Sequence, residues 1–285
     1  MSIASPVQTE AAPQPRFRLN WTIAIAAAIV GGWVLLAVFA PVVAPFDPNA
    51  VDIMHALAAP DSAHWFGTDQ VGRDVFSRVL HGARVNLLMC VAGVLPPLVI
   101  GTMVGLFSGY YGGVVDSLLM RIYDLTAAFP FFVLVLAIVG ALGPGLLNFF
   151  VALALVGWVT YARLVRAEVM GVRGSEYIQA AQCLGFSDRV VLFRHLLPNA
   201  FGSVVAYAVS DSVLVMLAGA SFGFLGLGAQ PPLAEWGVMI ADGSAFIRQA
   251  WWICTFPGLA TISLGLGLAF LGEGLGQLRR RQVSA

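Results

Sequence analysis

The sequence contains no lysine: all fifteen basic residues among its 285 are arginine. A phosphate-binding loop of the G-x-x-x-x-G-K-[ST] type needs a lysine, and so does Schiff-base catalysis. The chain therefore cannot hydrolyse ATP by the usual P-loop route on its own. Charged residues are scarce, at 11% against about 25% in an ordinary soluble domain. With 59% hydrophobic residues, this is the composition of a polytopic membrane protein.

The chain also has no net charge and few cysteines and histidines. Fifteen acidic residues offset the arginines, so no net charge draws the chain to nucleic acid. Cys90, Cys183 and Cys254 are far apart, and we interpret all three as small buried hydrophobic residues. The four histidines lack metal-ligand spacing such as H-x-x-x-H. We therefore predict no metal site and no catalytic residues in this chain.

Six apolar runs are long enough, or nearly so, to cross a hydrocarbon core about 30 Å thick. A cleaved signal peptide is the alternative for the first run, which is longer than a usual signal core. Internal prolines predict kinks. The predicted spans are 23–43, 85–107, 118–142, 146–161, 200–227 and 251–271. The predicted organisation is a disordered cytoplasmic tail (1–19), the first helix with an external loop (20–84), a membrane-spanning domain (85–275) and a cytoplasmic tail (276–285).

Arginine placement predicts the orientation. With the N-terminus inside, eleven arginines lie in inner segments and four in outer ones. Because inner loops are enriched in arginine and lysine, both termini are expected in the cytoplasm. The largest inner feature is then the segment 162–198.

That segment contains a short polar pattern, "EYIQAAQCLGFSDRVVLFRHLLPN". The Ala180-Ala181 pair favours a helix, and Gly185 suits the left-handed residue that ends one. Ser187 is a good N-cap for a second short helix reaching about residue 196, after which Pro198 restarts the chain at the membrane surface. We predict a helix, a tight turn and a second helix below the bilayer.

This pattern resembles the cytoplasmic "EAA" loop of binding-protein-dependent ABC importer permeases. Gln179-Ala180-Ala181, Gly185 and Leu197-Pro198 fall at matching spacings, although Gln179 replaces a glutamate and His195 an isoleucine. The stretch "HWFGTDQVGRDVFSRVLHGARVNL", together with "GWVTYARLVR" and "SFGFLGLGAQPP", resembles the "C" permeases of the peptide, opine and nickel importer group.

The resemblance implies an all-α, type I (MetI-like) importer fold with six transmembrane helices, in a bacterial or archaeal cytoplasmic membrane. It implies four partners: a second homologous permease, two cytoplasmic ATPase subunits that carry ATP and magnesium, and an extracytoplasmic substrate-binding protein. The expected cargo is a di- or oligopeptide, with nickel as the alternative. The coupling residues it implies are Glu176, Tyr177, Gln179, Ala180, Ala181, Leu184, Gly185, Leu197 and Pro198.

Two other classes are weighed against this interpretation. A proton-coupled secondary transporter would need an acid relay or inverted repeats, and the predicted spans hold a single midplane acid, Asp211. An intramembrane protease would need paired catalytic residues. The pattern G-x-S-x-G at 219–223 matches a hydrolase motif, but no histidine lies in any predicted span, so close helix packing explains it better.

Several charged residues remain to be placed. Asp211 either lines the transport pathway and contacts a cationic part of the cargo, or bonds a neighbouring helix. Arg121 and Asp124 are expected to form a local ion pair. Arg73, Asp74, Arg78 and Arg84 are expected on the charged side of an interfacial helix, with docking of the binding protein as the alternative.

Overall fold

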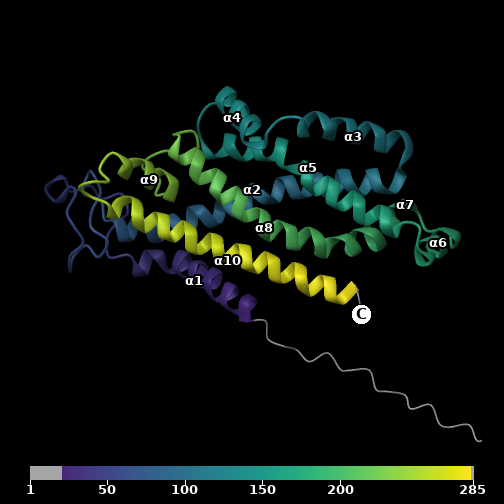
Figure 1. Ribbon diagram of the computed structural model, residues 1–285, viewed down its shortest axis with the longest axis horizontal. Helices are drawn as coiled ribbons and strands as arrows, with labels where there is room; N and C mark the ends of the chain where they lie inside the picture. Colours follow the sequence, from purple (N-terminus) through teal and green to yellow (C-terminus); the bar gives the residue numbers. More distant parts are fainter. Residues whose placement is uncertain (1–20, 284–285) are drawn as a thin grey trace, which may run out of the picture.

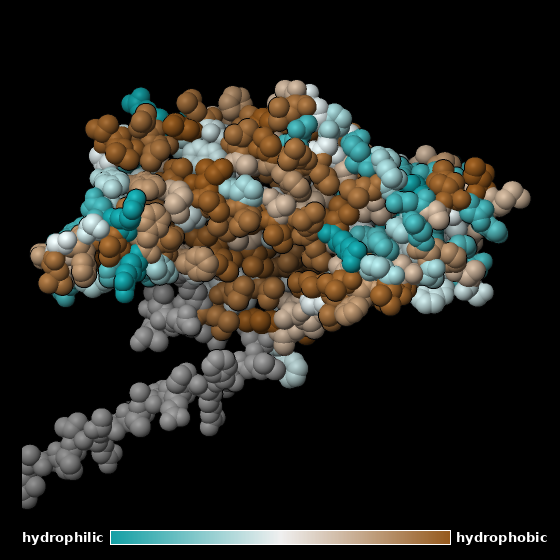
Figure 2. Space-filling view, turned by 180° about the vertical axis from the view of Figure 1, so that it is seen from behind, coloured by the Kyte–Doolittle hydropathy of each residue, from teal (hydrophilic) through white to brown (hydrophobic). Residues whose placement is uncertain are grey.

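The structure is a computed structural model that describes residues 21–283. The tail predicted at 1–19 lies outside these residues. Within them, every regular element is helical apart from an isolated bridge between Thr68 and Asp74. The long helices lie side by side along the longest axis of the molecule (Figure 1). Hydrophobic residues cover the middle of the surface and hydrophilic ones gather towards both ends (Figure 2).

Five helices in the described part of the chain are long and apolar enough to cross a membrane. A sixth span results if the bent pair α3 and α4 counts as one. The predicted number of spans is therefore confirmed, together with the all-helical fold. The bounds are α1 (Trp21–Val43), α2 (Val75–Tyr111), α3 (Gly113–Ala127), α4 (Phe131–Leu142), α5 (Leu146–Val172), α8 (Leu197–Phe224) and α10 (Trp252–Val283).

The third predicted span, 118–142, is broken rather than continuous. Its two helices are bent by 84° at Pro130, which stands at the N-cap of α4. Proline has no N–H to donate, and it disfavours helical geometry in the residue before it. The break brings Phe131 and Phe132 to the edge of a cavity beside α5 and α8.

Helix α2 runs through the centre of the bundle, in contact with α1, α3, α5 and α8. Its glycines at 101 and 105 lie so close to α5 that an added Cβ would overlap the carbonyl oxygens of Trp158 and Ala162. At Gly109 an added Cβ would come within 2.9 Å of Val169. Glycines four residues apart form one face of a helix, and membrane helices use such faces for close approach.

The glycines of the G-x-S-x-G pattern also serve packing. A Cβ at Gly219 would overlap Met89 on α2, and one at Gly223 would overlap the carboxylate of Glu235. Glu235 caps the short helix α9 (Trp236–Ser244) by accepting hydrogen bonds from the backbone of residues 237 and 238 at 2.8 and 2.9 Å. The packing interpretation of this pattern is therefore confirmed.

The predicted interfacial helix at residues 73–84 is wrong. Helix α2 already begins at Val75, and Arg78 is only 2% exposed. The Nε atom of Arg73 lies 2.6 Å from Asp69, and its Nη2 atom lies 3.6 Å from Asp242 of α9. These arginines are buried because the loop 44–74 folds back over the start of α2 and pairs with them. They join the external loop to the bundle and do not face a lipid headgroup.

Candidate functional site

A short helical segment extends beyond the spans at one end of the molecule (Figure 1). Helix α6 (Glu176–Cys183) follows α5 after a brief turn, with Ser175 at its N-cap. The amide of Gln179 donates to the carbonyl of Gly174 at 3.0 Å, which closes that turn. The predicted helix over Ala180 and Ala181 is therefore present.

Gly185 ends α6 as its position suggests. Its φ of 79° is in the left-handed region, where a side chain is unfavourable. The N–H of Gly185 donates to the carbonyl of Gln182 at 3.0 Å, and the N–H of Phe186 donates to that of Ala181 at 3.1 Å. This pair of bonds is the Schellman arrangement, which satisfies the last carbonyls of a helix.

The second helix of the segment is not the separate element that the sequence suggested. Helix α7 (Asp188–Val190) passes into a π-helical turn, η2 (Val191–Leu196), and on into α8 without a break. In a regular α-helix Pro198 would clash with the carbonyl of residue 194, and the wider π turn precedes it. Unbroken helical backbone thus runs from Asp188, directly after the turn that ends α6, into a spanning helix.

The segment has a buried face and an exposed apolar face. Ile178 is fully buried and Ala181 is 4% exposed, both packed onto the bundle. Tyr177, Leu184 and Phe186 are 47%, 75% and 47% exposed. Together with Ala180 they form what we name the tip surface. An apolar surface of this kind, held at the end of a rigid helix, is suited to contact with another protein.

Other predicted residues lie elsewhere, and one prediction is wrong. Leu197 and Pro198 belong to the first turn of α8, away from the tip surface. Cys183, expected to be buried, is exposed on α6, whereas Cys90 is buried and Cys254 half-buried. His195, noted in the sequence only as a departure from the loop pattern, stacks its ring on Phe186 at 6.1 Å between centroids and supports the tip surface.

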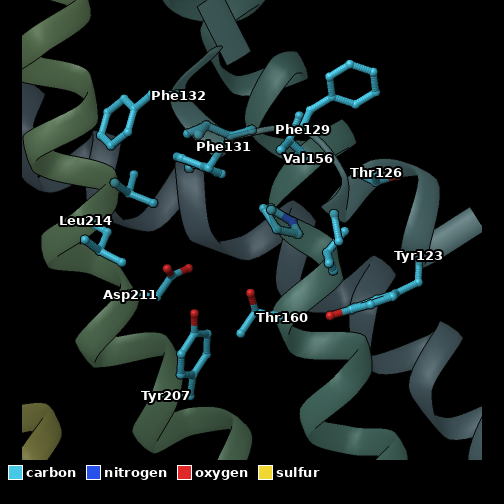
Figure 3. Close-up of a pocket in the computed structure, with 17 residues that line it drawn as sticks. Tyr123, Thr126, Phe129, Phe131, Phe132, Val156, Thr160, Tyr207, Asp211 and Leu214 are labelled. Atoms are coloured by element: carbon cyan, nitrogen blue, oxygen red, sulfur yellow. The ribbon is translucent and has the colours of Figure 1, made fainter. Parts of the chain in front are cut away.

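The second candidate site is a cavity of about 450 Å³ among the spanning helices (Figure 3). Asp211 and Tyr207 of α8 point towards Thr160 of α5 on one side of it. Phe131 and Phe132, beyond the break between α3 and α4, form an aromatic wall. Clefts of this size, mostly apolar with a few convergent polar groups, are typical of small-molecule sites.

Asp211 combines the two roles that the sequence left open. Its Oδ2 atom accepts a hydrogen bond of 2.8 Å from the hydroxyl of Tyr161 on α5, so it does bond a neighbouring helix. It also lines the cavity. Tyr207 interacts with the same carboxylate and with Thr160, and its ring meets that of Tyr161 edge-on at 5.0 Å. Tyr207 was detectable in the sequence, because it precedes Asp211 by one helical turn.

Charged pairs near the α6 end differ from expectation. Among the described residues, Arg121 and Asp124 form no salt bridge with each other. Instead Asp116 of α3 pairs with Arg166 of α5. The hydroxyl of Ser203 donates to Glu168, which links α8 to α5. Sequence reasoning missed these contacts because their partners are far apart in the chain.

The hydrophobic central band, the spanning helices and the protruding segment define a multi-pass membrane protein. Residues 101–281 match the family described as the binding-protein-dependent transport system inner membrane component, and residues 15–60 match the N-terminal transmembrane domain of oligopeptide transport permease C. The first match covers more than half of the chain, which therefore belongs to this family of ABC importer permeases.

Individual relatives agree with the family. The chain is 40% identical to the dipeptide transport system permease protein DppC of Alkalihalophilus pseudofirmus over 247 residues, covering 87% of this chain and 81% of that protein. It is 40% identical to the probable D,D-dipeptide transport system permease protein DdpC of Escherichia coli over 252 residues, covering 88% and 85%. Among solved structures, it resembles the inward-facing MetNI methionine ABC transporter with a TM-score of 0.56 at 20% identity, over 70% of this chain and 95% of that one. The last likeness shows the fold alone.

Proposed function

We propose that this permease forms, with a second homologous permease, the pathway by which an ATP-driven importer carries di- or oligopeptides across a bacterial or archaeal cytoplasmic membrane. An extracytoplasmic binding protein delivers the cargo. Two ATPase subunits bind ATP and magnesium and supply the energy. The peptide cargo is supported by the names of the relatives, which include dipeptide permeases.

The observation that carries this proposal is the tip surface and its connection to α8. Leu184, Tyr177 and Phe186 offer an exposed apolar patch beyond the bilayer, while Ile178 anchors the same helix to the bundle. Helical backbone then runs unbroken from Asp188 to Phe224. Because a helix is stiff, a displacement of the tip by an ATPase moves α8 directly. This arrangement couples nucleotide binding outside the membrane to alternating access within it.

The distribution of arginine supports a cytoplasmic tip surface. Arg166, Arg173, Arg189 and Arg194 lie on or beside the helices at the α6 end. At the opposite end, Arg73 and Arg78 are buried in salt bridges. Because arginine is enriched on the cytoplasmic side of membrane proteins, this distribution supports cytoplasmic termini.

Crosslinking tests the coupling role. We replace Leu184 with cysteine in a Cys183→Ser background and treat the complex, co-expressed with its ATPase and partner permease subunits, with a short bis-maleimide. We expect the introduced thiol to capture an ATPase subunit. The matched control, Asn49→Cys in the external loop, should capture none. Absence of any ATPase adduct from Leu184→Cys would contradict the proposal.

Uptake tests the transport role. We reconstitute the complex with its binding protein and measure uptake of the dipeptide alanyl-phenylalanine into vesicles with and without enclosed ATP. Uptake should require ATP. Uptake that continues without ATP and follows a proton gradient would instead identify a secondary transporter.

A further inference from the structure

The cavity beside α8 has an uneven distribution of polar groups. Asp211, Thr160 and Tyr207 gather on one side, and Phe131 and Phe132 form the wall across from them (Figure 3). No basic residue lines the cavity within the described part of the chain. A solute with one cationic end and one apolar end would fit this distribution.

The charge of Asp211 has no basic partner among residues 21–278, whose side chains the structure describes: the salt bridges in this range do not include it. Its carboxylate is oriented by two neutral hydroxyl groups, those of Tyr161 and Tyr207. Arg163 of α5 lies over the ring of Tyr123, a residue of the cavity lining, at 4.7 Å from the centroid. An acidic side chain within a membrane is costly and usually faces a charged partner or a water-filled path. Because Asp211 has no such partner here, a cation bound in the cavity can supply the countercharge.

A second cavity of about 320 Å³ also has an acidic residue and, among the described residues, no basic residue in its lining. It lies between α8 and α10, on the other side of Tyr207, which borders both cavities. Its charged lining residue is Glu273, and it too has no arginine in its lining. Tyr207 thus lies between two cavities, and each of them has a carboxylate in its lining.

We propose that the cavity at Asp211 binds the protonated amino group of a small cargo molecule, with the cargo's apolar part against Phe131 and Phe132. This assignment rests on the proposed transport function and names the chemistry that the pathway recognises. A primary ammonium has three N–H donors and no acceptor. The carboxylate of Asp211 and the hydroxyl oxygen of Thr160 can each accept one of them. The proton stays on the amine and no bond is broken.

A thiol-modification assay measures the preference for an amine directly. We introduce Thr160→Cys in the full chain and compare its rates of modification by cationic 2-aminoethyl methanethiosulfonate and by neutral methyl methanethiosulfonate. Mass spectrometry of the peptides distinguishes this thiol from the three native ones. Exposed Cys183 on α6 serves as the internal reference. We expect the ratio of cationic to neutral rate to be at least five-fold higher at position 160 than at Cys183.

The charge of Asp211 should account for that difference. Asp211→Asn, added to Thr160→Cys, should bring the ratio within two-fold of the Cys183 value and leave the Cys183 ratio unchanged. A ratio that stays high in Asp211→Asn overturns the proposal. If the double variant does not purify as a monodisperse protein, the Thr160→Cys chain alone still tests the proposal. A ratio of cationic to neutral rate at position 160 that is no higher than the ratio at Cys183 overturns the proposal as well.

The assay needs neither ATP nor uptake. Failure of the proposed transport function, seen as ATP-independent uptake, is therefore distinguishable from failure of the amine site, seen in the modification ratios. Uptake of alanyl-phenylalanine by the assembled importer adds a functional measurement. Asp211→Asn should lower it at least ten-fold while the ATPase subunits still co-purify, and unchanged uptake would overturn the role of this site in transport.

Discussion

Arg166 of α5 and Asp116 of α3 form a two-pronged salt bridge, with Nε to Oδ1 at 2.6 Å and Nη2 to Oδ2 at 2.7 Å. The hydroxyl of Ser108 on α2 donates to the same carboxylate. Three helices thus meet at one aspartate, close to where α2 turns into α3. This pair, together with the packing of Tyr123 on Trp158 and Ala162, holds the first half of the broken span against α5.

Replacing Arg166 by lysine should therefore destabilise the protein. Lysine keeps the charge but cannot make the paired hydrogen bonds of a guanidinium. Both side chains are partly exposed, at 30% and 20%, so solvent screening limits the expected loss to about 1 kcal/mol. Thermal unfolding in detergent measures it, with exposed Arg121→Lys as the control. Equal melting temperatures for Arg166→Lys and the wild type would count against this contact.

The contact between α2 and α5 predicts a larger effect at Gly105. Its added Cβ would overlap the carbonyl oxygen of Ala162, and neither backbone can move away easily. Overpacking of this kind costs about 1–3 kcal/mol. Gly105→Ala should lower the melting temperature, whereas Gly140→Ala, which meets nothing within 4 Å, should leave it unchanged or raise it slightly. If both variants melt alike, the close approach of the two helices is not what Gly105 provides.

Much of the fold could be predicted from the sequence, because a long uncharged run has few alternatives to a spanning helix. The ends of the helices could not. Helix α5 continues past Arg163 and Arg166 to Val172, since hydrophobicity reports where lipid ends and not where the helix ends. Pro130 was visible as a kink, but a bend of 84° depends on what packs around it.

In the candidate sites, too, the features set by neighbouring residues could be predicted, and those set by distant residues could not. The turn at Gly185 follows from local backbone chemistry, and its position was predicted. The burial of Arg78 and the contact between Tyr161 and Asp211 depend on residues far apart in the chain. Charge spacing along one helix suggested an exposed face for Arg78, and the loop that covers it has no local signal in the sequence.

Gly185 should be needed for coupling. With φ at 79°, a β-branched side chain there is strained, by roughly 1–2 kcal/mol, and the end of α6 would shift to relieve it. Gly185→Val should therefore leave ATP hydrolysis running while uptake in reconstituted vesicles falls several-fold. Gly174→Ala is the matched control, because that glycine has open space around it and no left-handed backbone. Normal uptake by Gly185→Val would refute a rigid tip.

The buried arginine at the external end allows the strongest prediction. The Nη1 atom of Arg78 donates to the carbonyl of Pro48 at 3.0 Å, and its Nε lies 3.8 Å from Asp69. Asp69 keeps its closer salt bridge to Arg73 when Arg78 is removed, so the main loss is the hydrogen bond of the guanidinium to Pro48, and bonds of this charged kind contribute about 1.5–3 kcal/mol. Arg78→Leu should accordingly unfold at a clearly lower temperature or fail to accumulate in the membrane. The exposed Arg248→Leu should behave as the wild type.

A second variant separates the charge from the packing. Asp69→Asn should itself destabilise the protein, because Asp69 also pairs with Arg73, and if Asp69 interacts with Arg78 the double variant with Arg78→Leu should lose less stability than the two single variants together. The difference between the double variant and the sum of the single ones measures the interaction. Strict additivity of the two substitutions would mean that Arg78 holds the loop through Pro48 alone. In that case Arg78 fixes the loop 44–74 through its hydrogen bond to the Pro48 carbonyl, and Asp69 pairs with Arg73 alone.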